Sequence, residues 1–377
     1  QNTGLIRRTR HARPHVHTTM GSNRPVAHVP IFKQVSPEGG GGTFERELHM
    51  CTRVLYNGEG GRVLTGRSMD WKTELQTDLW VFPRGMDRDG AAGDLSYKWK
   101  SRYGSVIASA YGVSTTDGIN EKGLVANVLW LVESGYPTIQ EGRPAISLSI
   151  WAQYVLDNFA TVAETVEALR EEKFVVITEA VPGEERLATM HLSVSDASGD
   201  SAVFEYIDGE LHIHHSRDYK VMTNSPIFSE QLAISSYWDD IGGTIMLPGT
   251  NRAADRFVRA RFYIDAIPQT EDRQTSVAAV YSVVRNVSVP YGISTANQPN
   301  ISTTRWRSVA DHHDLVYYFE PTLSPGIFWA RLSQFDLSEG APCMRLDIHA
   351  LQQQGRSGNA TKEFVPAEPF KFLPAGH

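Results

Sequence analysis

The sequence has only two cysteines, Cys51 and Cys343, among its 377 residues. Two cysteines cannot make the disulfide framework of a small secreted protein. The sequence also lacks an apolar run of about 18 residues, which excludes a membrane-spanning helix. A lone cysteine is most often a small buried side chain, and this is the expected role of Cys343.

An excess of positive charge is also missing. Lysine and arginine number 36 against 43 acidic residues, which gives a net charge of −7. Nucleic acids and anionic membranes are therefore not expected as partners. Hydrophobic residues make up 41% of the chain and charged residues 21%, as is typical of a globular protein with a large core.

Residues 1–50 differ in composition from the rest. Arginines and histidines cluster between residues 7 and 17, four glycines follow at 39–42, and apolar periodicity is absent. Without an apolar h-region the segment is not a secretory signal, so a cytoplasmic location is expected. We interpret it as a disordered leader, a propeptide or an over-extended start, whose basic cluster is more typical of a solvated tail than of a binding site. Residues 51–377 are expected to form one domain.

Cys51 directly follows Met50. If the chain starts or is cut at this point, Cys51 carries both a thiol nucleophile and a free α-amine, whose reference pKa of about 8 suits it to accept the thiol proton. Residues 51–56 and 62–67 are strand-like and flank a glycine-rich turn, which predicts a hairpin. The hairpin would return Arg67 and Asp70 towards Cys51, where a guanidinium stabilises a thiolate and a carboxylate holds an ammonium.

Cys51, Arg67, Asp70 and Trp71 resemble the start of the choloylglycine hydrolases, the family of penicillin V acylases and conjugated bile salt hydrolases. Further matches follow to about Tyr318. The resemblance implies an α+β fold, the four-layer αββα sandwich of two antiparallel sheets found in N-terminal nucleophile hydrolases. It also implies a small-molecule N-acyl amide substrate, a homotetramer or dimer, and catalysis with no metal or cofactor.

The resemblance also implies two groups that stabilise an oxyanion. One is a backbone N–H late in the strand at 124–132, which we align with Trp130. The other is the side-chain amide of Asn224, within Met222-Thr-Asn-Ser-Pro226. Ordinary core packing is the alternative role for Trp130 and for Trp71, and a helix cap or turn is the alternative for Asn224.

A second active-site arginine is implied at Arg256, in a helix predicted at 251–263. Three neighbours, Arg252, Arg259 and Arg261, compete for this role. An exposed basic helix face is the alternative for all four.

The remaining pattern fits two packed sheets with helices outside. Further helices are predicted at 144–158, 161–169 and 274–287, and strands at 79–82, 105–113, 189–195, 201–207, 211–215, 219–223, 301–311 and 315–319. His212 and His214 alternate along one of these strands with His215 next to them, which favours an exposed strand over a metal site. The tail from Gln352 is polar and proline-rich, and we expect it to be ordered only in part.

Together these features predict an N-terminal cysteine amidase that hydrolyses linear, non-peptide C–N amide bonds. Trp71 and Trp130 would form an aromatic pocket, which favours penicillin V or an N-acyl-homoserine lactone over a steroid. A conjugated bile salt hydrolase is the alternative within the family, and a non-catalytic ligand-binding member is the alternative outside it. The latter would be marked by loss of Cys51, Asp70 or Asn224, and all three are present. Cys51 also lacks the sequence context of a papain-type cysteine.

Overall fold

The structure is a computed structural model that describes residues 50–139, 142–294, 302–324 and 326–376. The predictions for the leader, residues 1–49, lie outside the described residues. The predicted hairpin is present, formed by β1 (Thr52–Asn57) and β2 (Val63–Trp71). In its antiparallel register Thr52 lies opposite Ser68, so the end of β2 returns to Cys51 as expected.

The hairpin lies within a seven-stranded sheet in which all neighbours are antiparallel except the last pair. Both strands of the predicted late pair are present. The first pairs with β2 and the second pairs with the first, so residues 303–321 extend the sheet away from β1. In spatial order the strands are β14 (Val221–Met222), β1, β2, β15 (Thr303–Asp311), β16 (Val316–Pro321), β17 (Phe328–Arg331) and β19 (Gly358–Asn359).

A nine-stranded antiparallel sheet holds most of the other predicted strands. Its spatial order is β13 (Glu210–His215), β12 (Ser201–Ile207), β11 (Met190–Ser195), β8 (Val125–Trp130), β7 (Ser114–Asn120), β6 (Ser105–Ala110), β3 (Leu79–Phe82), β18 (Met344–Leu346) and β20 (Val365–Pro366). Two short pairs lie outside it, β4 (Asp87–Asp89) with β5 (Lys98–Lys100), and β9 (Ala145–Ser147) with β10 (Val175–Ile177).

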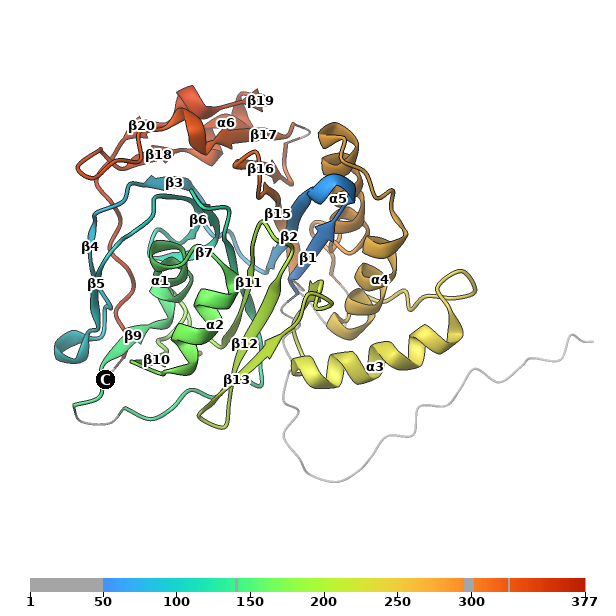
Figure 1. The fold of residues 1–377 in the computed structure, drawn as a ribbon, viewed down its shortest axis with the longest axis horizontal. Coiled ribbons are helices and arrows are strands. Elements are labelled where there is room, and N and C mark those ends of the chain that lie inside the picture. Colours follow the sequence, from blue (N-terminus) through green and yellow to red (C-terminus); the bar gives the residue numbers. More distant parts are fainter. Residues whose placement is uncertain (1–49, 140–141, 295–301, 325, 377) are drawn as a thin grey trace, which may run out of the picture. The chain divides into compact units, whose positions relative to one another are not determined.

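Helices cover the outer face of each sheet (Figure 1). The nine-stranded sheet is covered by α1 (Trp151–Asn158) and α2 (Val162–Arg170), and the seven-stranded sheet by α4 (Ala253–Ala266) and α5 (Arg273–Asn286), with α3 (Phe228–Ile241) packed on α4. A short helix, α6 (Ile348–Gln353), precedes β19. The order of layers is thus helix, sheet, sheet, helix, and the predicted four-layer α+β sandwich is confirmed.

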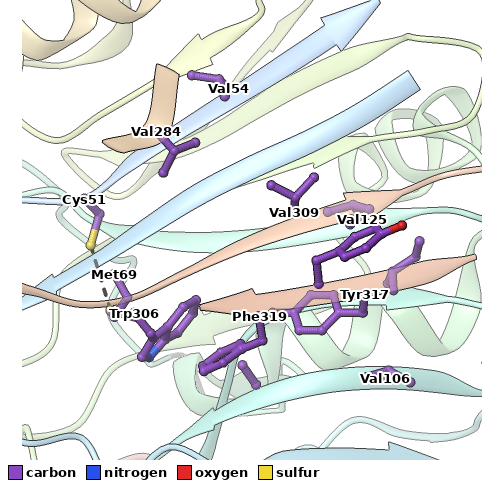
Figure 2. Close-up of a cluster of buried hydrophobic side chains, with 14 of the residues drawn as sticks. Cys51, Val54, Met69, Val106, Val125, Val284, Trp306, Val309, Tyr317 and Phe319 are labelled. Carbon is purple, nitrogen blue, oxygen red and sulfur yellow. Dashed lines mark hydrogen bonds between the residues drawn. The ribbon is translucent and has the colours of Figure 1, made fainter. Parts of the chain in front are cut away.

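The two sheets pack face to face over a large apolar core (Figure 2). Val309 and Tyr317 from the seven-stranded sheet belong to the same buried cluster as Val106 and Val125 from the nine-stranded sheet. Fully burying side chains of this size contributes roughly 1.5–3 kcal/mol each. Cys51 also belongs to this cluster, so its side chain packs against the core although the residue precedes β1.

Three local predictions differ from the structure. The helix expected from residue 144 begins only at Trp151, because residues 145–147 pair as β9 with the parallel strand β10. Helix α3 was not predicted; only Phe228, Gln231 and Ser235 are buried along it, so it lacks an apolar stripe. The tail after Gln352 is described as far as residue 376 and packs against the domain.

Among the helices of the described residues, none has the length and the hydrophobicity needed to cross a membrane.

Candidate active site

Cys51 lies just before β1, with its side chain almost completely buried. Its Sγ is 3.8 Å from the main-chain oxygen of Asp70 and 3.9 Å from Sδ of Met69. Burial raises the pKa of the Cys51 thiol, while the nearby guanidinium of Arg67 acts in the opposite direction. A thiol in this position needs a base close by to become a nucleophile.

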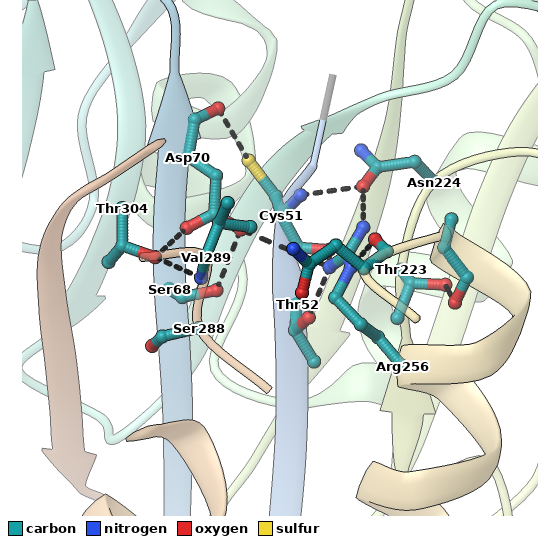
Figure 3. Close-up of polar contacts among 12 residues, drawn as sticks. Cys51, Thr52, Ser68, Asp70, Thr223, Asn224, Arg256, Ser288, Val289 and Thr304 are labelled. Atoms are coloured by element: carbon teal, nitrogen blue, oxygen red, sulfur yellow. Dashed lines mark hydrogen bonds and ion pairs between the residues drawn. The ribbon is translucent and has the colours of Figure 1, made fainter. Parts of the chain in front are cut away.

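Asp70 lies beside Cys51 near the end of β2 and is fully buried (Figure 3). One carboxylate oxygen accepts a hydrogen bond of 2.5 Å from Oγ1 of Thr304, which faces it across the β2–β15 ladder. The other oxygen accepts from Oγ of Ser68 at 3.3 Å and lies 3.9 Å from Nη1 of Arg256. Burial raises the pKa of Asp70 to about 6, although Arg256 and Thr304 favour the ionised form.

Arg256 is the arginine of α4 that reaches Cys51. Its Nη1 donates to the main-chain oxygen of Cys51 at 2.6 Å and to Oγ1 of Thr52 at 2.5 Å. Its Nη2 donates to Oδ1 of Asn224 at 2.8 Å. The side chain is completely buried, and this burial lowers the pKa of the guanidinium while Asp70 raises it.

The three competing arginines lie elsewhere. Arg259 donates to the main-chain oxygens of Pro248 and Thr250. Arg261 contacts Ser235 and Asp239, and Arg252 is exposed. Of these four arginines, the structure therefore brings Arg256 to Cys51.

Asn224 follows β14 and closes the site on the side opposite Asp70 (Figure 3). Its Oδ1 accepts from the backbone nitrogen of Cys51 at 2.6 Å as well as from Arg256. Its Nδ2 donates to the main-chain oxygen of Trp130 at 2.7 Å. The two ends of the amide are therefore assigned by their partners, since the oxygen faces donors and the nitrogen faces an acceptor.

Trp130, the last residue of β8, presents its backbone to Asn224. The next residue, Leu131, donates its N–H to Thr189 on the β11 side. Because successive backbone groups of a strand alternate in direction, the N–H of Trp130 points away from β11, to the side where Asn224 lies. The sequence predicted the N–H at this position as the important group; the carbonyl, as the acceptor for Asn224, was missed.

Arg67 approaches the site from between the sheets. Its guanidinium donates to the main-chain oxygens of Thr116 at 2.5 Å and Val128 at 2.8 Å. Nη1 also lies 4.0 Å from a carboxylate oxygen of Asp117. Arg67 thus links β2 to the facing sheet and brings positive charge next to the Cys51 thiol.

A buried histidine–glutamate pair lies behind Asn224. Nδ1 of His191 is 3.0 Å from Oε1 of Glu205, and Nε2 of His191 is 2.8 Å from the main-chain oxygen of Thr223. Glu205 also accepts from the backbone nitrogen of Phe228, at the start of α3. The pair therefore ties β11 and β12 to the segment that carries Asn224.

Electrostatics favours an ionised carboxylate at Glu205. Burial opposes ionisation, but hydrogen bonds with His191 and His214 outweigh it and lower the pKa of Glu205 to about 2. The predicted strand at 211–215 is present as β13, and its His214 and His215 contact the carboxylates of Glu205 and Asp200.

An apolar pocket opens at Cys51. Trp71 and Trp130 line it, with ring centroids 5.4 Å apart and planes inclined by 53°. The guanidinium of Arg186 lies over both rings, 4.4 Å from the centroid of Trp130 and 5.8 Å from that of Trp71. Both predicted tryptophans therefore share one pocket with the cysteine.

Several residues of the site were not predicted from the sequence. Thr52 directly follows Cys51 but was not identified as part of the site. Thr304 and His191 carry no motif of their own, and they reach the site only through the register of the sheets. Leu373, from the C-terminal tail, also lines the pocket. The strand that holds Thr304 and the strand that leads to Asp70 were both predicted, but their pairing was not, so the contact between the two residues could not be inferred.

Comparisons with known proteins show which family this chain resembles. The model of a family described as linear amide C–N hydrolases, choloylglycine hydrolase family, matches residues 51–348. A penicillin V acylase from Pectobacterium atrosepticum is 51% identical over 344 residues, which cover 85% of this chain and 92% of that protein. A bile salt hydrolase/transferase from Clostridium perfringens is 25% identical over 297 residues, which cover 72% of this chain and 88% of that protein.

Solved structures show the same similarity. The penicillin V acylase from Agrobacterium tumefaciens is 58% identical, with a TM-score of 0.80 and coverage of 86% of this chain and 99% of that chain. A mutant of the conjugated bile acid hydrolase from Clostridium perfringens superposes with a TM-score of 0.68 at 22% identity, over 78% of this chain and 96% of that chain. At 22% identity, the second comparison supports only a shared fold.

Proposed function

Because this chain belongs to the choloylglycine hydrolase family of linear amide C–N hydrolases, we propose that it cleaves N-acyl amides of the penicillin V type, with Cys51 as an N-terminal nucleophile. Hydrolysis of linear amides and the N-terminal nucleophile hydrolase fold are established by the family match and the superposed structures, as predicted. The proposal that Cys51 is the nucleophile rests on its contacts with Asn224 and Arg256, next to the paired tryptophans of the pocket.

The α-amine of Cys51 is the base in this proposal. In a chain that includes Met50, the nitrogen of Cys51 is an amide, which cannot accept a proton. Once residues 1–50 are absent, the same nitrogen becomes an amine held 2.6 Å from Oδ1 of Asn224. An amine with a reference pKa of about 8 can take the thiol proton that burial otherwise retains. We propose residues 51–377 as the single catalytic domain.

The reaction then proceeds in two steps. The thiol proton passes to the α-amine, and the thiolate attacks the substrate carbonyl to give a tetrahedral oxyanion. The α-ammonium returns the proton to the leaving nitrogen as the C–N bond breaks, which leaves a thioester on Cys51. Water, deprotonated by the α-amine, attacks the thioester and releases the acid and the free thiol.

Donors for the oxyanion are available at Asn224. Its amide nitrogen carries two N–H groups, of which the carbonyl of Trp130 accepts one. We assign the second N–H, together with the backbone N–H of Trp130, to the oxyanion. Asp70 orients the α-ammonium, while Arg67 and Arg256 supply the positive potential that favours the thiolate.

The acyl group is assigned to the pocket lined by Trp71 and Trp130. Two inclined indoles suit a flat phenoxyacetyl group or a flexible fatty acyl chain. The first of these is the acyl group of penicillin V, and the second is that of an N-acyl-homoserine lactone. A homotetramer or dimer, and a cytoplasmic location, stay predictions.

The test compares two purified proteins, the 377-residue chain and a chain that begins at Cys51. Release of phenoxyacetate from penicillin V is measured for each, next to N-decanoyl-homoserine lactone and glycocholate. We expect activity from the form that begins at Cys51 and none from a verified uncut chain. Equal rates from both forms would overturn the α-amine as base, and a preference for glycocholate by orders of magnitude would move the assignment to bile salts.

A further inference from the structure

The C-terminal tail reaches the substrate pocket. After β20 the chain runs along the nine-stranded sheet to the short strand β9 (Figure 1). Leu373, within this tail, lines the same pocket as Cys51, Trp71 and Trp130.

The main chain of Leu373 is held at this position from two sides. Its N–H donates to the main-chain oxygen of Val113 at 2.9 Å. Its carbonyl accepts from the hydroxyls of Ser147 at 2.7 Å and Ser149 at 2.8 Å. Val113 and both serines themselves line the pocket, so this part of the wall is a small network built around one residue of the tail.

The tail is also anchored before and after Leu373. Phe370 packs against Trp80 and Phe82, with ring centroids 5.4 and 5.8 Å apart. Ala375 is buried and donates its N–H to the main-chain oxygen of Ala91 at 2.8 Å. A segment fixed at three points presents its side chains in a defined position, which a mobile terminus would not do.

Leu373 lies in a part of the wall distinct from the reacting sulfur. The residues that hold it are Val113, Ser147 and Ser149, whereas Met69 and Asp70 contact Sγ of Cys51. The pocket is predominantly apolar between these two regions. Trp71 and Trp130 line this same pocket, together with Cys51 and Leu373.

We propose that Leu373 is a specificity-determining residue that forms the end wall of the acyl pocket and limits the length of the acyl chain. This rests on the proposed function, since it takes the group bound in the pocket to be the acyl part of an amide. A smaller side chain at 373 leaves room for additional methylenes, and a larger one occupies the space that the end of the chain needs.

The experiment uses chains that begin at Cys51 and compares wild type with Leu373→Ala and Leu373→Trp. N-acyl-homoserine lactones from hexanoyl to dodecanoyl keep the leaving group constant. For Leu373→Ala we expect the ratio of kcat/KM for dodecanoyl to hexanoyl substrates to rise roughly tenfold, on the order of what burial of one or two additional methylenes provides. For Leu373→Trp the same ratio should fall by a similar factor. Leu323→Ala, which changes an exposed leucine outside the pocket, is the matched control.

A second measurement separates this inference from the proposed function. Cys51→Ala protein, with and without Leu373→Ala, is titrated calorimetrically with hexanoate, decanoate and dodecanoate. Tighter binding of the longer acids in the Leu373→Ala protein supports the end wall even if no lactone is hydrolysed. An unchanged length preference in both measurements overturns it. The inference is also overturned if kcat/KM of the Leu373 variants changes when the leaving amine is varied and the acyl chain is kept the same. Leu373 would then contact the amine part of the substrate.

Discussion

Nη1 of Arg256 donates to the main-chain oxygen of Cys51 over 2.6 Å, while Nη2 of the same guanidinium holds Oδ1 of Asn224 at 2.8 Å. One buried cation thus fixes both the residue proposed as nucleophile and the amide proposed to stabilise the oxyanion. A planar, forked side chain can bridge two acceptors in this way, and an ammonium group cannot reproduce its geometry.

Replacement of this guanidinium should therefore be costly. We expect Arg256→Lys to lower kcat/KM for penicillin V by about 100-fold or more, comparable to the loss of one oxyanion donor. Arg261→Lys, which changes a partly exposed arginine on the same helix, should stay within about twofold of wild type. Wild-type kinetics in Arg256→Lys would show that the contacts are structural only.

The two cysteines should differ completely in importance. Cys51→Ala should abolish amide hydrolysis without a large change in thermal stability, because alanine fills most of the buried site. Cys343→Ala should leave turnover nearly unchanged, since Sγ of Cys343 contacts Sδ of Met86 rather than the pocket. Steady-state hydrolysis of penicillin V, with melting temperatures, tests both. Residual turnover by Cys51→Ala above the background of a mock preparation would contradict the proposed mechanism.

Activity should decline on the acid side as Asp70 becomes protonated. Its pKa of about 6 applies to a chain in which Met50 precedes Cys51, and a free ammonium nearby lowers it. The acid limb of kcat/KM should therefore have its midpoint at or below about pH 6. Thr304→Val removes a hydrogen bond that favours the carboxylate, so this midpoint should move upward by roughly one pH unit.

A control for that shift is Thr303→Val, which changes the neighbouring threonine on the opposite face of β15. Its pH profile should match wild type. A profile of Thr304→Val that also coincides with wild type would show that Asp70 does not govern the acid limb.

Trp130 should influence the acyl group more than the leaving amine. In Trp130→Ala, kcat/KM for penicillin V and N-decanoyl-homoserine lactone should fall about tenfold or more, where 1.4 kcal/mol corresponds to one decade. Trp238→Ala, on helix α3 outside the pocket, is the control. If Trp130→Ala instead improves glycocholate hydrolysis without loss on penicillin V, the indole does not contact a flat acyl group.

Glu205 should stabilise the fold in a pH-dependent way. Its pKa is about 2 in the folded protein against an ordinary value of 4.5. A depressed carboxylate pKa contributes stability that is complete above pH 4.5 and is lost as the pH falls towards 2. Glu205→Gln should therefore lower the free energy of unfolding by about 3 kcal/mol at pH 7, and by progressively less below pH 4.5.

Urea unfolding between pH 7 and pH 3 measures this difference. Glu210→Gln, which changes an exposed glutamate on β13, should show little effect at any pH. A Glu205→Gln difference that stays constant down to pH 3 would assign the loss to packing rather than to charge.

The sequence predicted the parts of the site that are local. The hairpin from Cys51 to Asp70 follows from two strand-like runs around a glycine-rich turn, and its register alone brings both residues together. Trp71 and Trp130 were expected in one pocket from the family pattern. The structure also shows that the two rings pack against each other and that the guanidinium of Arg186 lies over them.

The parts that depend on long-range register could not be predicted. His191 and Glu205 are adjacent only because β11 and β12 pair, and neither residue stands in a recognisable motif. Leu373 belongs to a polar, proline-rich tail held by scattered hydrogen bonds and by a few aromatic contacts such as that of Phe370, which leave no apolar period in the sequence. Helix α3 was missed because it buries only a few side chains.

The separation along the chain of the residues that meet at Cys51 has a consequence for how the protein matures. Cys51 contacts Asn224 at a separation of 173 residues and Arg256 at 205, and Asp70 contacts Thr304 at 234. Closing such long loops delays assembly relative to local hairpins and helices. We therefore expect the proposed catalytic residues to come together late in folding, whether on the ribosome or after dilution from denaturant. Enzymatic activity should therefore indicate that the entire sandwich has folded, and a fragment that lacks either sheet should be inactive.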